Sequence, residues 1–301
     1  MRLASLLWRD KPGLGLVIGD KVLVLSGVAG LDAARWGPLA NAADVSPLWT
    51  EPTGSLIREI YSRVRVSGVP PDWEPCCEAI EHCRWLPPVS MPEKIVCVGL
   101  NYRDHAAESG MQIPKEPVIF SKFNNALTGA SGPVVLPADS SQTDYEAELA
   151  VVVGKRAKKV PREKAMECVG GYTILNDVSA RDWQFKSGQW LVGKSFDTFA
   201  PCGPWLVTPD EVPDPHSLAV RLTLNGRIMQ DSNTSQMIFG IPALISYISH
   251  VFTLQPGDIL STGTPPGVGF ARRPPVFLQP GDKVQIEIES VGKMTHSCVS
   301  E

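Results

Sequence analysis

The sequence has no surplus of positive charge. Its 28 Lys and Arg residues stand against 32 Asp and Glu residues, which gives a formal net charge of −4. A protein that neutralises a phosphate backbone needs a basic surface, so this balance argues against nucleic acid as a partner. The most basic stretch, residues 154–159, is short, and we interpret it as a solvated turn rather than a binding patch.

Long apolar runs are also missing. No segment approaches the roughly 18 apolar residues that a membrane-spanning helix needs. The first eight residues lead into charged residues and proline, which is not typical of a signal peptide. We therefore expect a soluble protein without membrane contact, located in the cytoplasm. For a eukaryotic source a mitochondrial location stays open, although no transit peptide is visible.

The cysteines do not form a disulfide framework. There are seven, an odd number, and they are scattered along the chain. Cys76, Cys77, His82 and Cys83 form one local cluster, but their spacing matches no usual zinc site. We interpret them as reduced cysteines on or near a helix.

The pattern of apolar residues predicts a β-rich α+β protein with two domains. Trp85 to Pro92 is rich in proline, which disfavours the continuation of a helix, so we place a boundary there. Residues 1–90 are predicted to form a small N-terminal α/β domain and residues 91–301 the main domain. In the small domain we expect a hairpin over 13–25 and a helix over 56–64.

The main domain carries most of the predicted elements. Buried strands are expected at 94–100, 117–122, 144–153 and 172–176, and a hairpin at 220–230 around Asn225-Gly226. Helices are expected at 161–169 and 241–251, each with a proline near its first turn. The two Pro-Gly-Asp sequences, at 256–258 and 280–282, are interpreted as turns before strands.

Acidic residues alternate with other residues at the start of one predicted strand. Asp144, Glu146 and Glu148 would share one face, with Cβ atoms about 7 Å apart. Like charges this close repel and raise each other's pKa unless a cation joins them. An exposed acidic edge strand is the alternative, but the apolar run over 149–153 favours a buried strand and a metal site.

Asp177 follows another predicted buried strand and is a candidate third ligand. A set of carboxylates alone selects a hard cation such as Mg²⁺, Mn²⁺ or Ca²⁺. The alternative is that Asp177 only caps the following helical turn.

Three further segments carry candidate chemistry. His105 and Glu108 are three residues apart, so on a helix Glu108 could polarise His105 as a general base; the alternative is an exposed pair. Lys194 stands alone in an apolar run and could bind a substrate oxygen, or its head could simply reach water. The loop with Gly263 and Thr264 could hold a carboxylate through N–H groups and hydroxyls, yet matches neither a Walker loop nor a dinucleotide fingerprint.

Taken together, five ordered motifs over residues 92–301 resemble the fumarylacetoacetate hydrolase family. They are Gly-x-Asn-Tyr-x-x-His-x-x-Glu, Glu-x-Glu, Asp-x-Ser-Ala-Arg-Asp, Gly-Lys-Ser-Phe-Asp and Thr-Gly-Thr-Pro-x-Gly-Val-Gly. Within the family, Asn-Asp-Val-Ser-Ala-Arg-Asp-Trp-Gln and Gly-Lys-Ser-Phe-Asp-Thr-Phe are most similar to the domain-containing protein 2 group and its bacterial relatives. Residues 1–90 match the appended domain of the family only loosely, and the last strand matches imperfectly.

The resemblance implies a mixed β-roll or sandwich catalytic domain over 91–301, a homodimer, and a Mg²⁺ or Mn²⁺ ion, with Ca²⁺ an option in crystals. It assigns the metal ligands to Glu146, Glu148 and Asp177, with Asp144 behind or beside them. It assigns general base catalysis to His105, assisted by Glu108, and substrate contacts to Lys194, Gly263 and Thr264. Lys122, Arg181 and Gln184 match positions that line the pocket.

The implied reaction is metal-assisted hydrolysis of a C–C bond in a 2,4-dioxo acid of the acylpyruvate type. His105 and Glu108 would activate the water, and residues 105–114 would act as a lid. Alternatives are an oxaloacetate tautomerase or decarboxylase, and a hydrolase of a sugar-derived diketo-deoxy acid. A non-catalytic member is disfavoured because the dyad and the three ligands are intact.

Overall fold

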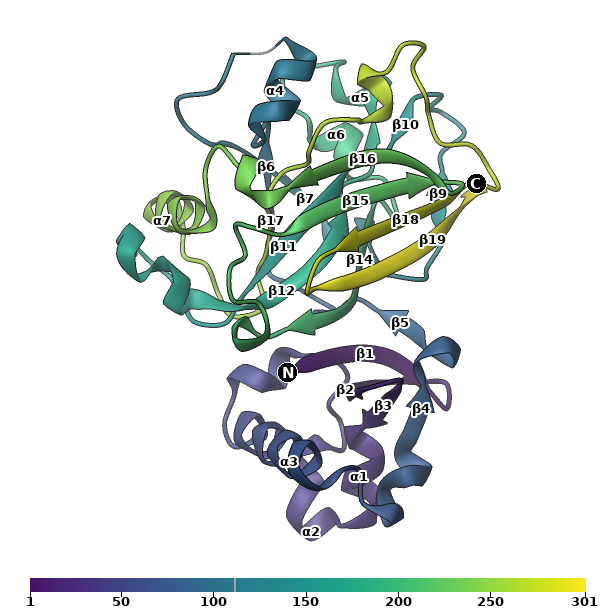
Figure 1. Cartoon of the computed structure of the whole chain (residues 1–301), viewed down its shortest axis with the longest axis vertical. Helices are drawn as coiled ribbons and strands as arrows, with labels where there is room; N and C mark the ends of the chain where they lie inside the picture. The colour runs from purple at the N-terminus through teal and green to yellow at the C-terminus, as the bar shows by residue number, and fades with distance from the viewer. Residues whose placement is uncertain (111) are drawn as a thin grey trace.

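A computed structural model describes residues 1–110 and 112–301, and Figure 1 shows a smaller N-terminal part beneath a larger β-rich part. The smaller part contains strands β1 (Arg2–Trp8), β2 (Lys11–Ile18), β3 (Lys21–Val24), β4 (Cys77–Ala79) and β5 (Arg84–Leu86), with helices α1 (Leu25–Leu31), α2 (Ala33–Trp36) and α3 (Thr53–Ser67). The predicted hairpin and helix of this part are confirmed. Within the described residues, no helix is long and apolar enough to cross a membrane.

One large mixed sheet runs through both parts. Its strands follow the order β4-β3-β2-β1-β14-β12-β11-β17-β6-β7. The members from the larger part are β6 (Ile95–Gly99), β7 (Val118–Lys122), β11 (Ala147–Val153), β12 (Val169–Asn176), β14 (Ala200–Val207) and β17 (Ile259–Ser261). The crossing is made where Leu3 of β1 pairs with Leu206 of β14. The boundary near residue 90 stays a prediction. Because strands from both parts share one sheet, a boundary there would divide that sheet.

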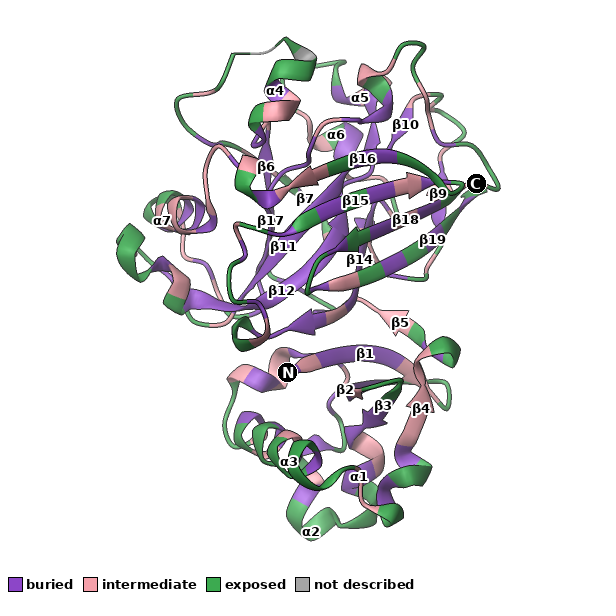
Figure 2. Ribbon diagram, viewed as in Figure 1, coloured by how far each residue is buried: buried purple, intermediate pink, exposed green. Residues whose placement is uncertain are grey.

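A second sheet covers the centre of the first and completes a sandwich. Its order is β16-β15-β18-β19-β9, with β16 (Arg227–Asn233), β15 (Ala219–Leu224), β18 (Lys283–Ile288), β19 (Gly292–Ser300) and β9 (Val134–Leu136). Buried and exposed residues alternate along β18 and β19, so one face of each packs on the core. Every residue of β11 and β12 is buried, and Figure 2 shows these strands in purple at the centre. The β-rich α+β prediction is confirmed.

Short helices surround the sheets. They are α4 (Arg103–Ser109), α5 (Arg181–Gln184), α6 (Leu191–Lys194), α7 (Ile241–Val251) and the 3₁₀ helices η6 (Arg162–Cys168) and η9 (Gly269–Ala271). Helix α7 has the predicted bounds, and the Asn225-Gly226 turn has positive φ at both residues, as a type I′ hairpin requires. The segment predicted as a helix at 161–169 is a 3₁₀ helix, because its bonds close i to i+3, as from Lys164 N–H to the Pro161 carbonyl.

All seven cysteines are free thiols, and six of them are buried. Burial, with the charge of Glu78, raises the pKa of Cys83 to about 12, and burial with the charge of Glu74 raises that of Cys77 to about 11. These two thiols are therefore protonated near neutral pH, which suits the interpretation of reduced, inert cysteines.

Candidate metal centre and active site

The predicted strand over 144–153 is interrupted just before the metal-ligand candidates. Asp144 belongs to a short strand, β10 (Thr143–Asp144), that pairs with β13 (Ser179–Ala180), and β11 begins only at Ala147. The prediction of one strand that carries all three acids is therefore wrong. The Asp144 carboxylate accepts hydrogen bonds from the backbone N–H groups of Gly269 and Phe270, and it shares Arg181 Nη2 with Glu146.

Two buried amide side chains hold the backbone at this interruption. Asn176 Oδ1 accepts from Glu146 N–H at 2.9 Å, and Gln230 Oε1 accepts from Ala147 N–H at 2.9 Å. These side chains replace the carbonyl groups that a continuous strand would have paired with. Because both amides come from other strands, the direction of the Glu146 side chain is set by tertiary contacts.

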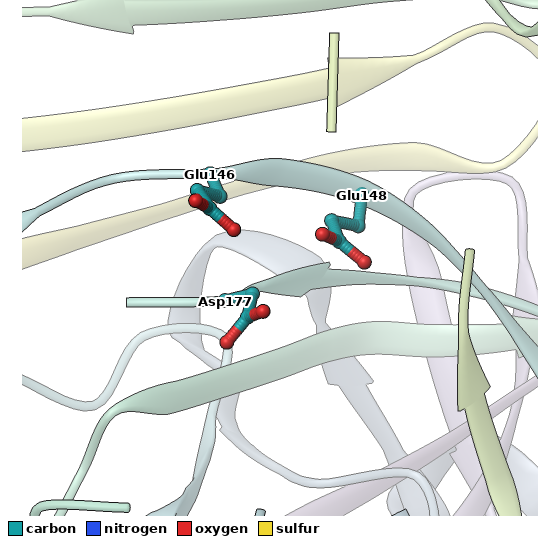
Figure 3. A group of neighbouring side chains, drawn as sticks. All are labelled: Glu146, Glu148 and Asp177. Carbon is teal, nitrogen blue, oxygen red and sulfur yellow. The ribbon is translucent and has the colours of Figure 1, made fainter. Parts of the chain in front are cut away.

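The carboxylates of Glu146, Glu148 and Asp177 converge on one point (Figure 3). One oxygen from each lies within 4.8 Å of the others, and all three side chains are buried. Glu146 precedes β11, Glu148 lies within it, and Asp177 follows the end of the neighbouring β12. In the described residues this is the one group of His, Cys, Asp or Glu side chains placed to hold a metal ion. Asp177 does not cap α5, whose N-terminus has no side-chain cap.

Cationic side chains surround this cluster. Lys194 Nζ donates to Glu146 Oε2 and to Asp177 Oδ2, each at 2.8 Å, and its side chain is 2% exposed. The alternative that its head reaches water is therefore wrong. Lys122 Nζ donates to Asp177 Oδ1 at 2.6 Å, and Arg181 bonds both Glu146 and Asp144.

Glu148 is the member of the cluster without a cationic partner. It accepts from the Ser261 hydroxyl and from Gly263 N–H, both neutral donors. Gly263 has φ +96°, and a Cβ there would lie 2.7 Å from the Cβ of Asn101, so glycine is required. The N–H of Gly263 therefore serves Glu148 of the protein itself, and the predicted contact of Gly263 with substrate stays a prediction.

The charges of the cluster leave room for a divalent cation. Four buried carboxylates, including Asp144, face three buried cations, so one negative charge is in excess. Burial and the charges of Asp177 and Glu146 raise the pKa of Glu148 well above its ordinary value. Burial would also raise the pKa of Glu146, but Lys194 and Arg181 outweigh it and lower that pKa to about 2. An all-oxygen donor set with surplus negative charge fits a hard divalent metal ion.

A cavity of about 210 Å³ opens beside the cluster. Its wall includes eight of the predicted site residues: His105, Glu108, Glu146, Glu148, Arg181, Gln184, Lys194 and Thr264. The other three, Lys122, Asp177 and Gly263, do not line the cavity. Asp177 bonds the lining residue Lys194, Lys122 bonds Asp177, and Gly263 bonds the lining residue Glu148. Thr264 Oγ1 donates to the Ala147 carbonyl at 3.1 Å and accepts from Gln230 Nε2 at 2.9 Å.

Helix α4 places the proposed base across the cavity. His105 Nδ1 lies 3.5 Å from Glu108 Oε2, and both Glu108 oxygens accept from Gly267 N–H. The buried Nδ1 of His105 has no hydrogen-bond partner in the described part of the chain. A small rotation would bring it to Glu108, as happens when catalytic hydrogen bonds tighten on substrate binding. Within the predicted lid, residues 105–114, Met111 lies outside the described residues.

The aromatic side chains of the cavity and Arg273 were not predicted from the sequence. Phe120 and Trp190 pack edge to face with ring centroids 5.4 Å apart, and Phe185 and Phe270 lie 5.4 Å apart with tilted rings. Arg273 also lines the wall. The sequence signal related to Trp190 is the glycine at position 99, at the end of β6. In the structure a Cβ at this position would lie 2.3 Å from the Trp190 ring, so the ring needs a glycine there.

The family model of the fumarylacetoacetate (FAA) hydrolase C-terminal region matches residues 94–299. The chain therefore belongs to the fumarylacetoacetate hydrolase family, and it is an enzyme of that family. It is 54% identical over 217 residues to the mitochondrial oxaloacetate tautomerase FAHD2A of Bos taurus, covering 71% of this chain and 69% of the relative. It is 52% identical over 216 residues to the mitochondrial oxaloacetate tautomerase fahd2 of Xenopus laevis, covering 71% and 68%.

A solved structure gives the same picture. The maleylpyruvate hydrolase of Sphingobium sp. SYK-6, in complex with manganese(II) and pyruvate, superposes with a TM-score of 0.77 and 34% identity, covering 100% of this chain and 99% of that chain. The predicted family membership is confirmed, as is the assignment as an enzyme. The roles of individual site residues stay predictions.

Proposed function

We propose that the protein interconverts the keto and enol forms of a small 2-oxo acid, with oxaloacetate as the substrate. The observation that carries the proposal is a single cavity lined both by Glu146 and Glu148 of the carboxylate cluster and by the His105–Glu108 pair. Such a site can bind the 2-oxo acid end and move a proton at the neighbouring carbon. The vertebrate relatives named as oxaloacetate tautomerases support this choice over the hydrolysis that the motifs first implied.

We propose Mg²⁺ or Mn²⁺ as the cation that Glu146, Glu148 and Asp177 hold. When bound, such a cation polarises the 2-oxo group and so acidifies the protons at C3. The manganese(II) in the structural relative supports the choice of metal.

The residues of the chain then have separate tasks in the proposed mechanism. His105 takes the proton from C3, breaking that C–H bond, and the electron pair moves to the C2 oxygen. Glu108, held by Gly267 N–H, orients the imidazole. Lys194 offsets the developing charge on the C2 oxygen. The proton that His105 took from C3 is then delivered to the C2 oxygen, which completes the enol and restores the neutral base. Gln184 and Thr264 orient the substrate on the cavity wall.

The test is ultraviolet detection of enol-oxaloacetate converting to the keto form with Mg²⁺ or Mn²⁺ present. His105→Gln is expected to reduce kcat by about 10²-fold or more, the usual contribution of a general base. His250→Gln, an exposed histidine on α7, is the matched control. Full activity of His105→Gln would contradict the assignment of the base.

Hydrolysis of a C–C bond in an acylpyruvate is the second candidate. The structural match to maleylpyruvate hydrolase favours it, because the same His105–Glu108 pair could activate a water. Release of pyruvate from acylpyruvates or fumarylpyruvate, measured with a coupled assay, separates the two candidates. The same assay run on oxaloacetate detects decarboxylation, and diketo-deoxy sugar acids complete the panel.

The metal site has a test independent of activity. Glu148→Gln removes the ligand that lacks a cationic partner and is expected to weaken Mn²⁺ binding by at least about 10²-fold, measured by calorimetry. Glu116→Gln, an exposed neighbour of the lid segment, serves as the control. Equal Mn²⁺ affinity in Glu148→Gln and the unaltered protein would remove Glu148 from the ligand set.

We further propose a homodimer, as the family resemblance implies. The groove beside the open edge of β7 contains Ile119, Phe123 and Leu191, and Phe123 is 57% exposed, so a second copy would shield apolar surface. Light scattering tests the mass in solution. The cytoplasmic location stays a prediction; the vertebrate relatives are named as mitochondrial proteins, and fractionation of the source cells decides.

A further inference from the structure

Arg273 differs from the other cations of the cavity wall. Arg181 and Lys194 each bond two buried carboxylates. Arg273 is exposed, and among the residues that the structure describes its guanidinium has one partner, the neutral carbonyl oxygen of Arg272, at 3.0 Å. Its positive charge is therefore available to a ligand in the cavity.

The loop that carries Arg273 is anchored firmly. Gly269 N–H and Phe270 N–H donate to Asp144 at 2.7 and 3.0 Å, and Asp144 in turn is paired with Arg181. Arg272 Nε donates to the Gly267 carbonyl at 3.3 Å. The backbone before Arg273 is thus bonded to Asp144, which shares Arg181 with Glu146. Because this backbone is already ordered, less backbone entropy is lost when Arg273 binds a ligand.

The charges of the buried cluster indicate which kind of ligand Arg273 can bind. The buried cluster has one negative charge in excess, so a divalent cation brings it to one positive charge, and one substrate carboxylate brings it to neutrality. A second carboxylate on the same substrate would again leave an unpaired negative charge in the cavity. Arg273 is the cation on the wall that can pair with it, and a guanidinium fork matches carboxylate geometry.

We propose that Arg273 binds the distal carboxylate of a 2-oxo dicarboxylic acid and so determines the preference for dicarboxylic substrates over those with an uncharged end. The inference rests on the proposed function in one respect, that the 2-oxo acid end of the substrate lies at the carboxylate cluster. The inference adds Arg273 as the residue that recognises the distal end of the substrate. Arg273 lies outside all five sequence motifs.

Binding provides a test that needs no turnover. Pyruvate is oxaloacetate without the distal carboxylate, so the ratio of their affinities reports that carboxylate alone. With the Mn²⁺-loaded protein, calorimetry is expected to show that Arg273→Gln weakens oxaloacetate binding by about tenfold or more and leaves pyruvate binding within about twofold. Arg273→Lys should recover part of the loss, because it restores the charge without the fork.

Kinetics provides the second arm. Arg273→Gln should raise KM for oxaloacetate more than it lowers kcat, and should leave the rate for the C4 methyl ester of oxaloacetate nearly unchanged. The matched control is Arg227→Gln, an exposed arginine of the β15–β16 hairpin outside the cavity, which removes the same charge from the molecule.

The outcomes separate the two proposals. An unchanged ratio of oxaloacetate to pyruvate affinity in Arg273→Gln, or an equal loss in Arg227→Gln, overturns the role of Arg273 whether or not tautomerisation is observed. An Arg273-dependent ratio in a protein that does not interconvert the tautomers supports the role of Arg273 and overturns the tautomerase function.

Discussion

At the residue scale, the metal-ligand candidates are held by a relay of buried polar groups. His296 Nε2 lies 3.0 Å from Asn176 Nδ2, and the carbonyl oxygen of that amide accepts from Glu146 N–H. Because the amide nitrogen is a donor, Nε2 must accept and Nδ1 must carry the proton. That Nδ1 is buried without a partner in the described residues. The neutral tautomer of His296 is therefore part of the support for Glu146.

The stability of the protein should depend on the protonation of His296. Burial lowers its pKa from 6.5 to about 4, so the unfolded chain binds this proton more readily than the folded one between these values. Neutral His296 therefore contributes to the free energy of unfolding fully above pH 6.5. This contribution, about 3 kcal/mol, is lost as the pH falls toward 4. Urea unfolding of the metal-free protein and of His296→Gln, from pH 7 to 4, measures the difference. Parallel curves would contradict the assignment.

At the scale of elements, the interruption between β10 and β11 creates the site. The interruption puts Asp144 in a separate strand from Glu148. There Asp144 accepts from the Gly269–Phe270 backbone and from Arg181, which also pairs with Glu146. Gln230 closes the interruption from β16 and also donates to Thr264 and to the Pro265 carbonyl. One amide therefore couples the start of β11 to the cavity loop.

Replacing this amide should loosen both segments. Gln230→Met keeps the volume but leaves the Ala147 N–H without its partner, which should cost about 1–3 kcal/mol of unfolding free energy. Mn²⁺ affinity should fall as well, because Glu146 is next to the freed group. Gln279→Met, at an exposed turn, is the control for urea unfolding and calorimetry. No change in either measurement would show that the interruption does not need Gln230.

At the scale of the whole molecule, one sheet joins the two parts of the chain. Strand β1 pairs with β2 along one edge, and along the other edge with β14 at its start and with β5 further on. The prediction of a boundary near residue 90 has to be weighed against this, because a chain cut there exposes the edge of β14.

A fragment of residues 91–301 should be less stable than the full chain. Removal of residues 1–90 takes away the ladder between β1 and β14, together with the buried side chains of Leu3 and Leu6. We expect a lower melting temperature and association through the bare edge, measured by thermal unfolding and light scattering, with Mn²⁺ binding retained in the folded fraction. A fragment as stable and as monodisperse as the full chain would show that residue 90 bounds an independent domain.

Local pattern in the sequence determined much of this protein. Period-two alternation before an apolar run predicted that Glu146 and Glu148 are buried carboxylates, and the structure confirms their burial. The turn at Asn225-Gly226 and the helix over 241–251 follow from local signals in the sequence. Ordered motifs identified the family and eight residues of the cavity wall.

Only the tertiary structure decided how these parts meet. Asp144 stands in a separate strand from Glu148 because Asn176 and Gln230, from other strands, take the backbone hydrogen bonds at the interruption. Lys194 bridges Glu146 and Asp177 instead of reaching water, and Arg273 faces the cavity because its loop is tied to Asp144. Each of these depends on hydrogen bonds or ion pairs between residues far apart in the chain, which periodicity along one segment does not contain.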